Sequence, residues 1–205
     1  MIETDILVVG SEGAGARAAI EASKCDLKVT VVTKGQMAKC GATMTAGAGI
    51  TLDGRSLRDL GFPGDSKDSK EKLFEDIVRT GGYLSNQRVA WTYVRDAPAR
   101  VKELLDWGMK VRSSGGRGIM TTGMEIVRVL REQVRRQDIE VIEDTMITDL
   151  LTNKNRVIGA VGLNLRTGEF VVVRAKAIIL ATGGWPKAYS FTNHPEGLTG
   201  DGQAM

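Results

Sequence analysis

Residues 5–22 read DILVVGSEGAGARAAIEA. Four apolar residues, Ile6–Val9, precede a turn that carries three glycines, and alanines then recur at helical spacing. A short apolar run of this kind is typical of a strand that is buried on both faces. Glycines let backbone N–H groups approach a pyrophosphate, and the N-terminus of the following helix favours an anion. The stretch therefore predicts a dinucleotide-binding strand–turn–helix unit.

One residue of this turn departs from the dinucleotide pattern. In the register Gly-x-Gly-x-x-Gly the glycines would be residues 10, 12 and 15, but Glu12 occupies the middle position. A side chain is normally absent there so that the diphosphate can come close, and a carboxylate repels phosphate unless it points to solvent. We expect the Glu12 side chain to turn away from the diphosphate, so that replacing it with glycine leaves nucleotide affinity about unchanged. An ordinary turn without nucleotide is the alternative.

Composition narrows the class of protein. The 205 residues are 42% hydrophobic and 26% charged, with a net charge of +3 from 28 basic and 25 acidic residues. These values are ordinary for a globular chain with one sizeable core, and the basic residues form no run that would suggest nucleic-acid binding. Cys25 and Cys40 form neither a metal-binding set nor a disulfide framework, which suits reduced thiols in a cytoplasmic protein. No apolar run is long enough to predict a membrane span.

The second predicted strand bears on the choice of nucleotide. It covers Lys28–Thr33 and ends in Thr33-Lys34-Gly35, where NAD-binding folds carry an acidic residue for the ribose hydroxyls. The missing acid disfavours an NAD dehydrogenase, although the Thr33 hydroxyl could still hydrogen-bond to a ribose. The following segment, Ala38–Leu52, is rich in glycine, alanine and threonine. Such a segment either packs against other backbone or lines a flat ligand with its N–H groups.

Helical signals follow. Four helices are expected: Asp68–Thr80, a helix capped by Ser85, a helix that Pro98 opens and Gly108 ends, and a helix opened by Thr122. Asp68 with Glu71, and Thr122 with Glu125, have the spacing of capping boxes, and proline suits a first helical position. Trp91 is expected in the core.

The period then changes from helical to alternating. Four strands are expected in an antiparallel meander: Ile139–Ile142, Met146–Leu151, Val157–Leu165 and Glu169–Val173. One more buried strand, Ala177–Ala181, leads into Thr182-Gly183-Gly184. The order of elements predicts an α/β, Rossmann-like fold with a central parallel sheet, an antiparallel β-meander and inserted helices.

Four stretches in this order carry a family resemblance: VVGSEGAGARAAIEA (8–22), TKG with GATMTAGAGI (33–50), AIILATGG (177–184) and LTGDGQAM (198–205). With them, the chain resembles the N-terminal FAD-binding part of the flavoprotein family that includes succinate dehydrogenase and fumarate reductase flavoprotein subunits and L-aspartate oxidase. The resemblance spans essentially all 205 residues. It implies one FAD-binding domain over residues 1–205, with the family's capping, substrate-binding domain absent from a truncated chain.

The resemblance also implies an FAD site. Its residues would be Gly10, Ser11, Gly13, Ala14 and Gly15 at the pyrophosphate, Thr33, Lys34 and Gly35 as the Ser/Thr-Lys segment, Gly41, Ala42, Thr43, Ala46, Gly47 and Gly49 beneath the isoalloxazine ring, and Ala181, Thr182, Gly183 and Asp201 from the later motifs. For Asp201, a plain N-terminal helix residue is the alternative. Ala42 stands where succinate dehydrogenases carry a histidine joined covalently to FAD, so we expect non-covalent FAD.

The implied chemistry is hydride transfer between flavin N5 and a C4 dicarboxylate, in electron transport. The family's proton-donating arginine and its substrate-binding histidine and arginine would lie beyond residue 205, so no catalytic residue and no metal ligand is assigned, and we expect the 205-residue chain alone to lack turnover. The family's histidine-bearing dicarboxylate stretch is short here (residues 111–117) and has no histidine, and His194 is interpreted as a solvated loop residue.

Other flavin functions remain open at this point. They are an L-aspartate oxidase, an adenylylsulfate reductase α-type flavoprotein, and a truncated flavin-binding module without activity. The resemblance further implies an iron–sulfur subunit as a partner. It also implies a cytoplasmic location, either free or held at the inner face of a membrane through partner subunits.

Overall fold

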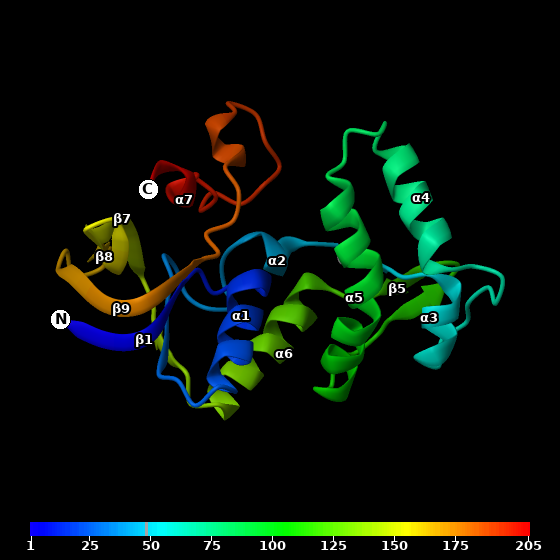
Figure 1. Cartoon of the computed structure of the whole chain (residues 1–205), viewed down its shortest axis with the longest axis horizontal. Coiled ribbons are helices and arrows are strands. Elements are labelled where there is room, and N and C mark those ends of the chain that lie inside the picture. Colours follow the sequence, from blue (N-terminus) through cyan, green and yellow to red (C-terminus); the bar gives the residue numbers. More distant parts are fainter. Residues whose placement is uncertain (48) are drawn as a thin grey trace. The chain divides into compact units, whose positions relative to one another are not determined.

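The structure, a computed structural model, describes residues 1–47 and 49–205. The chain divides into two compact units, which we describe separately: Met1–Ala46 with Ile126–Met205, and Gly47–Glu125. The first unit is built on a six-stranded sheet with the strand order β6-β2-β1-β9-β8-β7 (Figure 1). This order confirms a mixed α/β fold with a parallel part and an antiparallel part.

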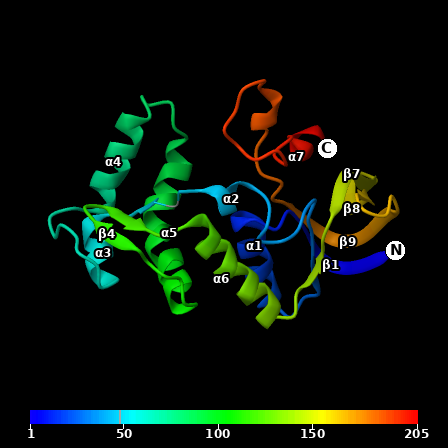
Figure 2. The ribbon, with the colours of Figure 1, turned by 180° about the vertical axis from the view of Figure 1, so that it is seen from behind.

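The parallel part contains the predicted strand–turn–helix unit. Its elements are β1 (Ile2–Val9), α1 (Gly13–Ser23), β2 (Val29–Val32), β6 (Glu140–Ile142) and the second half of β9 (Phe170–Leu180). Leu7, Val8 and Val31 have no solvent exposure, as expected for strands covered on both faces. Helices α1 and α6 (Gly123–Arg136) lie side by side (Figures 1 and 2), and the Ser23 hydroxyl donates a hydrogen bond to the side chain of Gln137 just beyond α6.

The antiparallel part differs from the predicted meander in two respects. It consists of β7 (Thr145–Asn153), β8 (Arg156–Asn164) and the first half of β9. The segment predicted as the first meander strand is instead β6, which pairs in parallel with β2. The last two predicted strands are one strand, β9, which pairs antiparallel with β8 and parallel with β1. Burial alternates without interruption through Val173, Arg174 and Ala175, so nothing in the side-chain pattern requires a break there.

The second unit combines helices with a small sheet. Its elements are β3 (Gly49–Thr51), α3 (Gly54–Asp59), α4 (Lys70–Thr80), α5 (Gln87–Asp106), β4 (Ser113–Gly115) and β5 (Gly118–Met120), and α6 leads the chain back into the first unit. The sheet order is β3-β5-β4. Its core is an apolar cluster around Leu52, Leu57 and Ile119. Within the described ranges, no helix has both the length and the apolar character needed to cross a membrane.

Several predicted helix boundaries in this unit are wrong. Helix α5 is continuous and contains Pro98, which was expected to open a helix of its own. An internal proline destabilises a helix by about 3 kcal/mol. The buried residues Val94, Ala97 and Val101 form one apolar stripe on both sides of Pro98, and their packing stabilises a single continuous helix. The helix is capped by Asn86, whose side chain accepts the N–H groups of residues 88 and 89, and not by Ser85.

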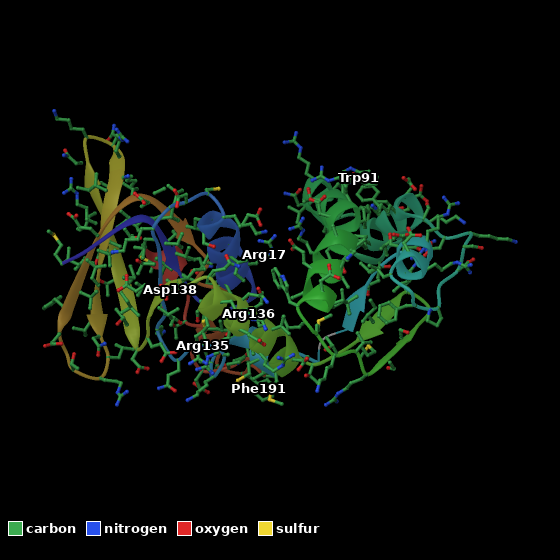
Figure 3. The ribbon with its side chains drawn as sticks, turned by 90° about the horizontal axis from the view of Figure 1, so that it is seen from below. Arg17, Trp91, Arg135, Arg136, Asp138 and Phe191 are labelled. Carbon is green, nitrogen blue, oxygen red and sulfur yellow. The ribbon has the colours of Figure 1, made fainter. Side chains whose placement is uncertain are left out.

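Two further side chains lie elsewhere than predicted. Ser69 caps α4 by accepting the N–H of Lys72, so Asp68 is free for a different role. Trp91 (Figure 3) is not in the core, because it is 38% exposed on α5. Its ring meets that of Phe74 edge to face, with the centroids 5.5 Å apart. The cap at Thr122 is confirmed, because its hydroxyl accepts the N–H of Glu125 at 3.1 Å.

Candidate functional site

A cavity of about 1020 Å³ opens in the first unit at the carboxyl ends of β1, β2 and β9. This end of a parallel sheet is where open α/β folds bind ligands, and the volume is at the upper end of the range for small-molecule sites, about 300–1,000 Å³. Most residues predicted for the cofactor line this cavity: Gly10, Ser11, Gly13, Ala14, Thr33, Lys34, Gly35, Gly41, Ala42, Thr43, Ala181, Thr182, Gly183 and Asp201. The fold thus brings four separated sequence segments to one place.

Four predicted residues are not brought to the cavity wall. Gly15 is buried beneath the turn, where a Cβ would lie 1.9 Å from the carbonyl oxygen of Gly10, so it serves close helix–strand packing. Ala46 does not line the cavity, and Gly47 and Gly49 belong to the second unit. Ala48, in the middle of the predicted loop, lies outside the described residues.

The glycine turn is held tightly between two strands. The N–H of Gly10 donates to Val32 O at 2.8 Å, and its φ is +109°. A Cβ at this position would lie 2.2 Å from Ala181 O at the end of β9. Only glycine satisfies both the backbone conformation and the close approach, so the first glycine of the motif fixes the turn against the sheet.

The Ser11 and Thr33 side chains are hydrogen-bonded to each other. Ser11 Oγ donates to Thr33 Oγ1 at 2.9 Å, and the two residues are 4% and 5% exposed. The pair joins the glycine turn to the end of β2. Both residues therefore shape the cavity by positioning its walls.

Lys34 forms an ion pair across the cavity wall. Its ammonium lies 2.9 Å from Asp201 Oδ2 and donates to Thr199 Oγ1 at 2.6 Å, while Thr199 donates to Asp201 Oδ1 at 2.6 Å. These contacts hold the TGDG turn and the start of α7 (Asp201–Ala204) to the end of β2. Among the described lining residues, Lys34 is the only lysine or arginine, and Asp201 balances its charge.

Glu12 turns toward the neighbouring glycine-rich segment. Its Oε2 accepts the N–H of Thr43 at 2.7 Å, and the N–H of Gly13 donates to Thr43 Oγ1 at 3.3 Å. Gly41, with φ +85°, leaves room for this side chain, because a Cβ there would lie 2.4 Å from Glu12 Cδ. The carboxylate thus does not point to solvent, which was the condition under which we expected it to be harmless to a phosphate.

Several lining residues were not predicted from the sequence: Thr145, Met146, Ile147, Leu165, Trp185, Tyr189, His194, Leu198, Gly202 and Gln203. The first three begin β7, whose Thr145 N–H donates to Thr33 O at 2.9 Å, a long-range contact that no local pattern indicates. The aromatic residues directly after ATGG are the one signal that could have been used. His194 is an exposed loop residue, as predicted, and it also contributes to the rim of the cavity.

Cys40 lies on the same wall. Its thiol donates to Gln36 O at 3.2 Å. Burial raises the pKa of the Cys40 thiol, and the negative charges of Glu12, Glu143 and Asp144 raise it further. This part of the cavity is therefore unfavourable to additional negative charge.

The residues present fit an FAD molecule with one exception. The first turn of α1 presents backbone N–H groups, which bind diphosphate without a cationic side chain. Apolar side chains such as Val9, Val32 and Ile147 line part of the cavity, and an apolar lining suits ring systems. Glu12 is the exception. Elsewhere in the described parts of the chain, no cluster of acidic, histidine and cysteine side chains could hold a metal ion.

The segment of residues 111–117, which we compared on the basis of sequence with a dicarboxylate-binding stretch, lies within the second unit. It forms strand β4 and the turn to β5. Arg117 makes two contacts with the Asp68 carboxylate, including Nε to Oδ2 at 2.6 Å, and pairs with Asp76 at 2.7 Å. The Arg117 guanidinium thus links two acidic side chains of the second unit and has a structural role there.

Three comparisons with known proteins bear on the site. The profile of the FAD binding domain family matches residues 5–118 and 111–205. One subunit of the fumarate reductase (CoM/CoB) of Methanothermobacter marburgensis is 35% identical over all of this chain and 39% of its own length. L-aspartate oxidase of Streptomyces coelicolor is 30% identical over all of this chain and 37% of its own length.

A solved structure shows the same similarity in three dimensions. The Mycobacterium smegmatis Sdh1 complex in the apo form superposes with a TM-score of 0.87 and 33% identity, over 99% of this chain and 38% of that one. The chain thus spans about two-fifths of the length of the relatives it matches.

Proposed function

The chain belongs to the FAD binding domain family, in the group of fumarate reductase and succinate dehydrogenase flavoproteins. We propose that it forms the FAD-binding part of an oxidoreductase that acts on a C4 dicarboxylate such as fumarate or succinate. The observation that carries the proposal is the cavity, where four motif segments meet. The similarity to a fumarate reductase supports the choice of substrate class.

The chain's own part in this function is to bind and orient the cofactor. When bound, FAD supplies hydride chemistry at N5 of its isoalloxazine ring. The N–H groups at the first turn of α1 would hold the diphosphate, and the Lys34–Asp201 pair would close the TGDG turn against β2. Ala42 and Thr43 would contact the cofactor from the glycine-rich segment. We propose non-covalent binding, because Ala42 offers no nucleophile.

No residue within 1–205 is proposed as the proton donor. The substrate carboxylates require cations and the proton transfer requires a titratable group at the reacting carbon, and we propose that the remaining length seen in relatives carries them. Electron exchange with an iron–sulfur subunit, together with a cytoplasmic location, is part of the same proposal.

A second candidate is an L-aspartate oxidase. It is supported by the Streptomyces coelicolor relative, which is 30% identical over the whole of this chain. The FAD-binding part does not separate the two functions.

Two measurements test the proposal. First, the 205-residue chain is titrated with FAD and flavin fluorescence is followed; saturable binding is expected, and failure to bind would refute the assignment of the cavity. Second, the whole protein is assayed for fumarate-dependent oxidation of a reduced dye and, in parallel, for aspartate-dependent reduction of oxygen. Fumarate turnover supports the first candidate, and aspartate turnover without it selects the second.

A further inference from the structure

Two large aromatic residues at the cavity are mostly exposed. Trp185 and Tyr189 both line the cavity, and they are 58% and 67% exposed. Aromatic residues make up only 5% of the chain, yet these two lie within five residues of each other at one site. Aromatic surface in contact with water is unfavourable, and large rings gain the most when another surface covers them. A flat ligand that enters the cavity would provide that cover.

The backbone around Trp185 is held in place. Trp185 leads into a single 3-10 turn, η1 (Pro186–Ala188), whose proline fixes the backbone φ of the next residue. The N–H of Lys187 donates to Leu198 O at 3.2 Å, which joins this turn to the segment before α7. Gly200 leaves space for Trp185, because a Cβ at Gly200 would lie 2.9 Å from Trp185 Cβ. This part of the wall is thus ordered before a ligand binds, which lowers the entropic cost of binding.

We propose that Trp185 stacks against a flat aromatic ring of bound FAD and that Tyr189 flanks the same ring. FAD carries two such rings, adenine and isoalloxazine, and both are of a kind that stacks on aromatic side chains. This inference rests on the proposed function, because it assigns a role within the FAD site. It adds a binding residue directly after the ATGG stretch, at a position outside the four stretches that carry the family resemblance.

Stacking suits a cavity with little free positive charge. Lys34 is the only lysine or arginine among the described lining residues, and its ammonium lies 2.9 Å from Asp201 Oδ2. Attraction between charged side chains and the cofactor is therefore limited. Contacts to a ring add affinity that does not require a free charge on the protein.

The test measures the dissociation constant of FAD for the 205-residue chain by flavin fluorescence. Trp185→Phe keeps an aromatic ring, whereas Trp185→Leu keeps an apolar side chain without one. Phe191→Leu is the matched control, because Phe191 (Figure 3) is 94% exposed in the same segment and is not among the described residues that line the cavity. ADP and FMN, which carry one ring each, are titrated in parallel to identify the stacked ring.

We expect Trp185→Leu to bind FAD about tenfold more weakly than the unaltered chain, and Trp185→Phe to bind within about threefold of it. Phe191→Leu should bind like the unaltered chain. The loss in Trp185→Leu should appear for whichever of ADP and FMN carries the stacked ring. An equal loss for both would indicate a general disturbance of the cavity and would overturn the proposal.

A second readout needs no variant. In hydroxyl-radical footprinting of the unaltered chain, read by mass spectrometry, bound FAD should protect Trp185 and Tyr189 severalfold and leave the labelling of Phe191 unchanged. This measurement decides alone should Trp185→Leu fail to fold.

FAD binding that is equally tight in Trp185→Leu, or no protection of Trp185 by bound FAD, would overturn the role of Trp185 and leave the FAD site intact. Absence of FAD binding to the unaltered chain would overturn the proposed function as well, so the two failures are distinguishable.

Discussion

Replacing Asp68 with asparagine should destabilise the second unit in a pH-dependent way. The Asp68 side chain is 7% exposed and accepts from Arg117 Nε at 2.6 Å and from the Gly54 N–H at 2.8 Å. The Arg117 guanidinium and these hydrogen bonds lower the pKa of Asp68 from 3.8 to about 2. Each pKa unit is worth about 1.4 kcal/mol, so the charged form contributes about 2 kcal/mol to the free energy of unfolding.

The sign of the pH dependence follows from the lowered pKa. Because Asp68 is more acidic in the folded chain, its contribution is complete above about pH 4 and is lost as the pH falls toward 2. Asp68→Asn should therefore lose about 2 kcal/mol at pH 7, and this difference should shrink as the pH falls from about 4 toward 2, where the carboxyl of the folded chain also becomes neutral.

Urea denaturation followed by tryptophan fluorescence measures this effect. In a Trp185→Phe background the remaining tryptophans, Trp91 and Trp107, both report on the second unit. Asp106→Asn is the control, because its exposed pair with Lys102 should be worth less than about 1 kcal/mol. An Asp68→Asn chain as stable as the parent at pH 7, or a difference that persists unchanged in acid, would refute the reasoning.

Three other predictions concern the first unit. Acid precipitation of the FAD-loaded protein should release all flavin, because Ala42 offers no attachment; colour that stays with the pellet would contradict this. Gly10→Ala should prevent folding or cost more than about 3 kcal/mol in thermal denaturation, since its Cβ would collide with the carbonyl of Ala181, directly after β9. Gly61→Ala is the control from the second unit: its φ is also positive but its Cβ would enter open space, so it should cost only the conformational term of about 1–2 kcal/mol. Cys25 is exposed and should be alkylated faster than Cys40 at pH 8, because the pKa of Cys40 is raised; equal rates, read by mass spectrometry, would contradict the description of that wall.

Local patterns predicted the parts of the fold that depend on neighbours in sequence. The turn from β1 to α1 follows from an apolar run, three glycines and a helical alanine spacing, all within residues 5–22. The extent of β9 and the continuity of α5 through Pro98 could not be predicted in this way. Each depends on a partner elsewhere: β9 pairs with β1 and β8, and the buried face of α5 belongs to a core that includes Leu52 and Ile119.

The site shows the same division. The motif residues were found because the family pattern identifies them by type and order. The contacts that define their roles connect distant positions, such as Lys34 with Asp201 and Glu12 with Thr43. From the sequence alone, Glu12 is only a departure from the glycine motif. The structure shows that its Oε2 accepts the Thr43 N–H and that its Oε1 has no hydrogen-bond partner in the described chain.

These contacts also show how a cavity with so little positive charge could bind a diphosphate. Lys34 is neutralised by Asp201, so the attraction has to come from backbone N–H groups at the first turn of α1 and from the glycine-rich segment. Backbone donors are fixed in place and have no charge of their own, so their net effect depends strongly on any acidic side chain beside them. At this turn the acidic side chain is Glu12. Its hydrogen bond from the Thr43 N–H holds this carboxylate toward the glycine-rich segment, so this contact helps to set how the turn receives a diphosphate.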